Sequence, residues 1–195
     1  MSRAPAVRAS SVRDTLAFLD KFETGARSKV MARVPSASRD IIESTPRSSW
    51  ISIEHSHFTV DAIVELFGRE RAIRFWRDTF AHLVEGPLLG SFVSGMVRVF
   101  GRDPMRVVGL FPKGWSLVYR DMCSPRLVSS EDHRPVIRFE NIAPEVRSAY
   151  RNYLHSWHGA CQGFAHVARV QGRVEFTVSP DASVAEAKFF WIRTP

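Results

Sequence analysis

The hydrophobic positions in the first half of the chain recur with the period of an α-helix. Over Thr15–Val34 they fall three or four residues apart, although Gly25 interrupts the run. Val60–Phe67 has the same spacing and is followed by Gly68, a residue type that often ends helices. Arg69–Val84 carries a third apolar face. We also predict helices over 88–100 and from the capping pair Asp103 and Pro104 to Leu110.

The period changes to two after Pro112, which is the spacing of a half-buried strand. Alternation of apolar and polar residues predicts strands at Trp115–Tyr119, Ile137–Phe139, Val174–Val178 and Lys188–Arg193. A helix of about twenty residues is expected to begin at Pro144, between the second and third strands. This order predicts an α+β fold, in which an N-terminal helical layer is followed by a mainly antiparallel four-stranded sheet with the long helix inserted between the strand pairs.

The composition is that of an ordinary folded protein, with 45% hydrophobic and 24% charged residues in a chain of 195. Residues 1–12 carry arginine and serine without an acidic residue. We therefore expect a flexible basic tail over residues 1–12 and a single α+β domain over residues 13–195. No apolar run approaches the roughly 18 to 20 residues that cross a bilayer, so no membrane span is expected.

Charge and cysteine content bear on partners and location. The formal net charge is +7, but the basic residues are scattered rather than gathered into a run. Association with nucleic acid is therefore an alternative rather than the leading hypothesis. Cys123 and Cys161 are the only cysteines, which argues against a disulfide framework and favours a cytoplasmic protein.

Familiar catalytic and phosphate-binding motifs do not occur in the sequence, which lacks H-E-x-x-H, the nucleophile elbow, the Walker A loop and G-x-G-x-x-G. Cys123 could act as a nucleophile if His133 lay beside it as a base. A small, partly buried thiol is the favoured interpretation of Cys123. The sequence therefore names no catalytic set, and an enzyme is the less favoured class.

Two groups of histidines are candidate metal or heme ligands. In the stretch EHSHFTVD, His55, His57 and Asp61 could form a three-ligand metal site if the segment is extended. The favoured alternative is the start of a helix, with Thr59 as the cap and Asp61 near the positive end of the helix dipole. His82 flanks an apolar helix face and could ligate heme iron, although a packed neutral histidine is the commoner role.

The stretch HSWHGACQGF in the predicted long helix brings two histidines and a cysteine close together in sequence. At 3.6 residues per turn, Trp157, Cys161 and Phe164 fall on the core-facing side. His155 points to nearly the opposite side and His158 to a different flank. The three candidate ligands diverge, so we expect no metal site here.

A second face of the same helix carries small and polar residues. Asn152, Ser156, Gly159 and Gly163 fall within about 60° of each other. Because glycine costs on the order of 1 kcal/mol in a helix interior, two on one strip indicate that something approaches the backbone closely. The neighbour could be another helix of the chain, a second copy in a homodimer, or a bound ligand.

Two longer passages resemble a known family. These are FGRDPMRVVGLFPKGWSLVYRDM, residues 100–122, and the preceding SSWISIEHSHFTVDAIVELFG. With the late glycine-containing helix and the two strands after it, they resemble an uncharacterised paralogous family abundant in Myxococcus-type bacteria, over residues 28–195. The resemblance implies a bacterial protein but no particular activity.

The order of elements is also similar to heme nitric-oxide/oxygen-binding domains and to 4-vinyl-reductase-type domains. Both bind small hydrophobic molecules or gases between a helical layer and a sheet, as the resemblance implies for this chain. The Y-x-S-x-R signature that holds the heme propionates does not occur here, and no cysteine follows Cys161 as in many vinyl-reductase-type domains. We therefore expect no cofactor.

The leading functional hypothesis is a non-enzymatic bacterial regulatory or sensor domain. It would receive a small apolar ligand or a protein partner between the helices and the sheet, as a homodimer. Candidates for lining such a cavity are Trp115, Tyr119, Phe139 and Trp157, which ordinary core packing explains equally well. The alternatives are a nucleic-acid-associated protein and a heme or metal sensor.

Overall fold

The computed structural model describes residues 4–84, 90, 91, 95, 104–129, 134–167 and 172–191. The helices of the first half are α1 Ala9–Phe22, α2 Ala26–Met31, α3 Ser36–Ser44, α4 Ile53–Phe67 and α5 Arg69–Leu83. The later helices are α7 Pro104–Gly109, α8 Phe111–Val118, α9 Pro144–Ser148 and α10 Tyr153–Val167. The strands are β1 Ala6–Arg8, β2 Trp50–Ser52, β3 Tyr119–Arg120, β4 Ser124–Ser129, β5 Val136–Glu140, β6 Gly172–Val178 and β7 Ala185–Trp191.

The strands form two antiparallel sheets. One has three strands in the order β2-β1-β3, and the other has four in the order β4-β5-β7-β6. In the larger sheet Ile137 pairs with Ala187 and Phe139 pairs with Ala185, which places buried side chains of neighbouring strands on the same face. The predicted α+β fold, with helices first and an antiparallel four-stranded sheet after them, is confirmed.

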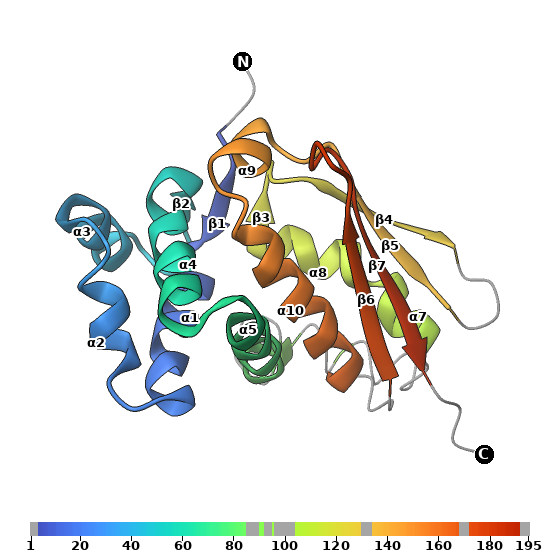
Figure 1. The fold of residues 1–195 in the computed structure, drawn as a ribbon, viewed down its shortest axis with the longest axis horizontal. Helices are drawn as coiled ribbons and strands as arrows, with labels where there is room; N and C mark the ends of the chain where they lie inside the picture. Colours follow the sequence, from blue (N-terminus) through green and yellow to red (C-terminus); the bar gives the residue numbers. More distant parts are fainter. Residues whose placement is uncertain are drawn as a thin grey trace.

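The elements are arranged so that two helices separate the remaining N-terminal helices from the larger sheet (Figure 1). Helices α1 to α4 lie on one side, the four-stranded sheet lies on the other, and α5 and α10 lie between them. Helix α10 packs against α5 and also contacts β6. The N-terminal helices and the C-terminal elements therefore meet along α5 and α10.

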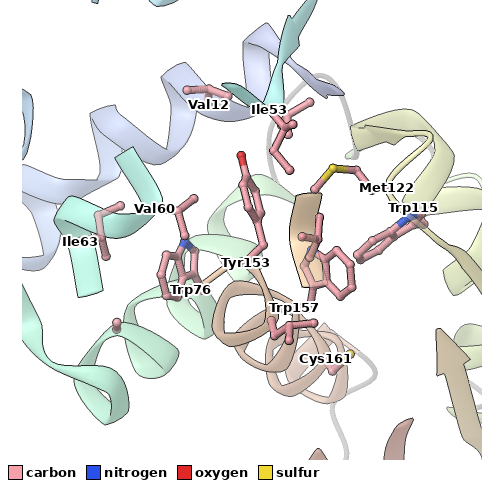
Figure 2. Packing of buried hydrophobic residues seen from close by; sticks show 14 of the residues in the cluster. Val12, Ile53, Val60, Ile63, Trp76, Trp115, Met122, Tyr153, Trp157 and Cys161 are labelled. Atoms are coloured by element: carbon pink, nitrogen blue, oxygen red, sulfur yellow. The ribbon is translucent and has the colours of Figure 1, made fainter. Parts of the chain in front are cut away.

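Aromatic side chains fill much of the interior beside α10. Trp157 is fully buried, and its ring stacks on that of Phe139 with 5.6 Å between centroids. Trp115 meets Trp157 edge to face at 5.1 Å, as Figure 2 shows from close by. Such pairs prefer offset or edge-to-face geometry, so these contacts add to the free energy of burial.

Two glycines lie at breaks between helices, as the sequence predicts. Gly25 has a φ of 76° and separates α1 from α2, and Gly68 has a φ of 72° between α4 and α5. Both values lie in the left-handed region that glycine adopts at low cost. The predictions for α5 and for strands β5, β6 and β7 agree with the structure within a few residues.

The strand predicted at Trp115–Tyr119 is wrong. Trp115 lies in α8, and only Tyr119 reaches a strand, the two-residue β3. Phe111 and Trp115 are four residues apart and both are buried, which is the spacing of one helix face. The apolar alternation was compatible with either period over so short a stretch. The strand that completes the larger sheet is β4, which the sequence pattern did not indicate.

The flexible tail predicted for residues 1–12 also differs from the structure. Ala6–Arg8 is the central strand of the smaller sheet, and α1 already begins at Ala9. Ala6 and Val7 are 2% and 4% exposed. A three-residue strand has too few positions to show a period, so only its pairing with β2 and β3 reveals it.

Helix α4 begins earlier than predicted, and Thr59 does not cap it. The first helical residue is Ile53, and the cap is Ser52, whose Oγ accepts a hydrogen bond of 3.3 Å from the Glu54 amide. Thr59 lies inside the helix and donates to the Ser56 carbonyl at 2.7 Å. The first two turns of α4 contain several polar residues, so the hydrophobic pattern did not predict a helix there.

The long helix expected from Pro144 is divided. α9 ends at Ser148, and α10 starts at Tyr153, with Asn152 accepting backbone hydrogen bonds from the first turn of α10. The short helix expected from Asp103 and Pro104 corresponds to α7. The helix predicted over 88–100 falls mostly outside the described residues. Among the helices that the structure describes, none is long and apolar enough to cross a membrane.

A candidate ligand cavity between the helices and the sheet

The interior holds a cavity of about 100 Å³ where α1, α4 and α5 meet α8, β3 and α10. Both halves of the chain therefore contribute to its wall. Apolar side chains make up most of the lining, among them Val12, Val60, Ile63, Trp76, Phe80, Phe111, Trp115 and Phe164. Figure 2 shows Val60 and Trp76 on one side of Tyr153 and Trp115 on the other.

Besides the indole N–H groups of Trp76 and Trp115, the polar side-chain groups of the wall are hydroxyls. They belong to Ser11, Thr15, Thr59, Thr79, Tyr119, Tyr153 and Ser156. The described lining contains no charged side chain and no histidine, cysteine or methionine. This combination suits an uncharged ligand, because burying a charge without a partner is costly.

Several of these hydroxyls belong to one hydrogen-bonded group. The hydroxyl of Tyr153 lies 2.7 Å from Ser56 Oγ, and Ser156 Oγ donates to the Tyr153 carbonyl at 2.7 Å. Burial raises the pKa of the Tyr153 hydroxyl and that of Tyr119 well above the ordinary value for tyrosine. Both phenols are therefore neutral at physiological pH. The group links α4 to α10 at one end of the cavity.

Thr79 of α5 is another hydroxyl in the wall. Its side chain is buried, with 2% of the residue exposed, and Oγ1 has no hydrogen-bond partner among the described residues. An unpaired buried hydroxyl lowers the free energy of unfolding. A hydrogen bond from Thr79 to a polar atom of a ligand or to a water molecule would remove this penalty.

The candidate lining residues from the sequence fall into two sets. Trp115, Tyr119 and Ser156 lie in the wall of the cavity. Phe139 and Trp157 are fully buried in the adjacent aromatic core and are not among the described lining residues. Tyr153 also lines the cavity. The sequence did not indicate this, because Tyr153 lies on the apolar face of α10 and that position predicts only core packing.

The glycine strip of α10 packs on α5 of the same chain. A Cβ at Gly159 would lie 2.5 Å from the Ile73 carbonyl oxygen, and one at Gly163 would lie 2.6 Å from that of Arg77. Asn152, at the start of the strip, donates to Asp61 Oδ1 at 2.8 Å. Of the three neighbours considered for the glycines, the structure supports another helix of the chain.

The candidate metal ligands of α4 point to different partners. His55 Nδ1 lies 3.2 Å from Ser38 Oγ, whereas the ring of His57 stacks on Tyr150 with 4.1 Å between centroids. Asp61 instead accepts the hydrogen bond from Asn152. Within the described part of the chain, no three histidine, cysteine or acidic side chains are grouped to hold a metal ion.

The other reactive candidates also have structural partners. His82 stacks on Phe18 with 5.3 Å between ring centroids, and its Nε2 lies 3.3 Å from Lys21 Nζ. Burial raises the pKa of the Cys123 thiol, which disfavours the reactive thiolate. His133, its conceivable base, lies outside the described residues.

Comparison with known proteins finds similarity in structure only. The chain matches no family model and no curated protein. A solved structure described as probing the function of heme distortion in the H-NOX family has a TM-score of 0.59 and 9% identity, with 96% of each chain covered. The chain has an H-NOX-like fold. A variant of T. tengcongensis H-NOX matches with a TM-score of 0.57 and 10% identity, over 95% of this chain and 98% of that chain.

These matches bear differently on the resemblances drawn from the sequence. The similarity to heme nitric-oxide/oxygen-binding domains is confirmed at the level of the fold. The resemblances to the Myxococcus-type family and to the vinyl-reductase-type domains stay predictions. The expectation that the chain has no cofactor is contradicted, because heme is the group studied in one of the similar structures.

The described cavity wall does not by itself fit a heme. Its volume of about 100 Å³ is below the roughly 150 Å³ of an engineered cavity that binds benzene, a molecule far smaller than a porphyrin. Tyr119 and Tyr153 are the only described lining residues of a type that ligates heme iron. Burial opposes the phenolate form of both, so the described residues offer no ready iron ligand.

A partial match to the heme signature lies outside the described cavity wall. Residues 122–126 read M-C-S-P-R, which keeps the serine and arginine spacing of Y-x-S-x-R but has Met122 in place of tyrosine. The Arg126 side chain is 67% exposed and pairs with Glu140 at 3.4 Å. Arg126 is not among the described residues of the cavity wall, so it does not supply a cation for a propionate inside that cavity.

Proposed function

We propose that this chain is a sensor-type domain that takes a small, mainly apolar ligand into the cavity between α1, α4, α5, α8 and α10. The cavity itself carries the proposal, since it is lined mainly by apolar side chains and has no charged group in its described wall. An engineered apolar cavity of roughly 150 Å³ stays dry and binds benzene or xenon, so a cavity of about 100 Å³ suits only molecules of this small class. The H-NOX-like fold supports a sensor role.

Ligand binding can be transmitted because the wall comes from two parts of the chain. Val12 and Ile63 lie on the N-terminal helices, whereas Trp115 and Phe164 lie on α8 and α10. A ligand can change how the N-terminal helices pack against α8 and α10. It does so only if it binds one of the two packing arrangements more tightly than the other. The cavity is the place where such a difference would arise.

Titration with benzene tests this proposal. Trp76 and Trp115 line the cavity, so we expect benzene to change tryptophan emission and to raise Tm. At ten times its Kd, benzene should add about 1.4 kcal/mol to the free energy of unfolding. Ala160→Leu fills the cavity from α10 and should abolish both effects. Absence of any response in the folded wild-type protein, up to the solubility of benzene, contradicts the proposal.

Heme binding is the second candidate, and the similarity in fold to H-NOX structures favours it. It requires the described cavity to enlarge and an iron ligand to come from outside the described wall. Titration with hemin, followed in the Soret region, tests it. A saturable one-to-one Soret change that competes with benzene supports heme, and a non-saturable change, or one that benzene does not reduce, counts against it.

Three further predictions from the sequence keep that status. These are association with nucleic acid, formation of a homodimer and a cytoplasmic location. Mobility of duplex and single-stranded DNA at low salt tests the first, because phosphate contacts make binding strongly salt-dependent.

A further inference from the structure

We propose that the ligand of this cavity is a small uncharged molecule that donates a hydrogen bond to hydroxyl oxygens at the Tyr153 end. This inference rests on the proposed function, and it adds the chemical class of the ligand. It follows from where the hydroxyl hydrogens of the wall are already directed.

Two hydroxyls in the wall have their single hydrogens engaged with backbone carbonyls. Ser156 Oγ donates to the Tyr153 carbonyl at 2.7 Å, and Thr59 Oγ1 donates to the Ser56 carbonyl at 2.7 Å. A hydroxyl has one hydrogen and two lone pairs. Toward the cavity, Ser156 and Thr59 therefore retain only the capacity to accept.

The Tyr153 hydroxyl has the same restriction through its partner. Ser56 Oγ directs its hydrogen to the Ser52 carbonyl at 3.3 Å, which leaves its lone pairs for Tyr153 at 2.7 Å. Either hydroxyl can donate at this distance, and we assign the donor role to Tyr153 because the Ser56 hydrogen is directed to the Ser52 carbonyl, so that the Tyr153 oxygen accepts from a ligand. Figure 2 shows the Tyr153 ring standing out from α10 with its oxygen directed toward Val12 and Ile53.

These three acceptors belong to one connected group. The Thr59 hydroxyl donates to the Ser56 carbonyl, the Ser56 hydroxyl contacts that of Tyr153, and the Ser156 hydroxyl donates to the backbone carbonyl of Tyr153. The cavity thus has an apolar body and one end rich in acceptor oxygens. A neutral donor fits this end, because no acidic side chain in the described wall would pair with a cation and no basic one with an anion.

Pyrrole and furan are suitable probes, because they are similar five-membered rings and only pyrrole carries an N–H donor. We expect Tyr153→Phe to weaken pyrrole binding by roughly two- to tenfold, the size of one net hydrogen bond, and to leave furan binding nearly unchanged. Affinities are measured by calorimetry or by tryptophan emission on the full chain. Thr59→Val is the second variant and should act in the same direction.

Ile63→Val is the matched control, since Ile63 lines the cavity without a polar atom. It should shift pyrrole and furan equally. If Tyr153→Phe and Thr59→Val both fold and both change the two affinities equally, the donor inference is overturned while the cavity remains a binding site. If neither probe nor benzene binds to the wild-type protein, the proposed function fails as well.

Discussion

His158 lies on the side of α10 that contacts β6. Its ring stacks on Phe176 with 5.2 Å between centroids and an interplanar angle of 10°, and Nε2 lies 3.0 Å from Gln162 Nε2. Burial lowers the pKa of His158, and the nearby charges of Arg69 and His155 lower it further. The folded protein therefore binds a proton at His158 less readily than the unfolded chain does.

This shift predicts that stability depends on pH below the ordinary histidine range. Between the unfolded pKa, about 6.5, and the lower folded one, the unfolded state binds more protons, so stability falls as the pH falls. Urea unfolding from pH 7.5 to 5 measures the slope, and His158→Gln should flatten it. The prediction is contradicted if His158→Gln leaves the slope of stability against pH unchanged and NMR titration of the wild-type protein gives His158 its ordinary pKa.

The sequence indicated several of the residues in the cavity wall, but it did not indicate which distant residues they contact. Trp115, Tyr119 and Ser156 were candidates and lie in the cavity wall, although their role in ligand binding stays a prediction. Tyr153 was missed, because its hydroxyl partner Ser56 is 97 residues away in the chain. No local pattern encodes a pairing at that separation.

Helices α5 and α10 pack closely, with two glycines of α10 against the backbone of α5. At Gly159, an added Cβ would lie 2.5 Å from the Ile73 carbonyl and 2.7 Å from Trp76 Cβ. Both neighbours are rigid parts of a helix, so they cannot yield without moving α5. The sequence indicated the close approach, and only the fold identified which element makes it.

Gly159→Ala should accordingly destabilise the protein by about 1–3 kcal/mol, the usual range for overpacking a core. Gly109→Ala is the control, because the nearest atom to its added Cβ is 4.0 Å away. The control should be neutral or slightly stabilising, since alanine favours the helix over glycine. Equal denaturant midpoints for Gly159→Ala and the wild type contradict this account of the contact.

The elements that the sequence predicted best were long and strongly periodic. α5 and strands β5 to β7 have enough positions to distinguish a period of 3.6 from a period of two. β1 and β3 have three and two residues, and their pairing depends on segments more than forty residues away. α8 was mistaken for a strand because Trp115, Leu117 and Tyr119 alternate in the sequence with Ser116, Val118 and Arg120.

At the scale of the whole molecule, the fold places an interior cavity where the two halves of the chain meet. The order of elements in the sequence was sufficient to predict an α+β fold, whereas the ligand between helices and sheet, which the resemblance to sensor domains implied, stays a prediction. It could not predict the size of the cavity or the composition of its wall, because described side chains from seven separate elements define both. Those two properties distinguish a small neutral ligand from a heme.

A crystal of the full chain pressurised with xenon shows whether this cavity admits a small apolar molecule. Xenon reports accessible apolar volume without requiring any particular chemistry of recognition. We predict xenon density within the cavity, in contact with Val60, Ile63 and Trp76, and its loss in Ala160→Leu. Well-ordered wild-type crystals that show no xenon there, while surface sites are filled, would contradict the account.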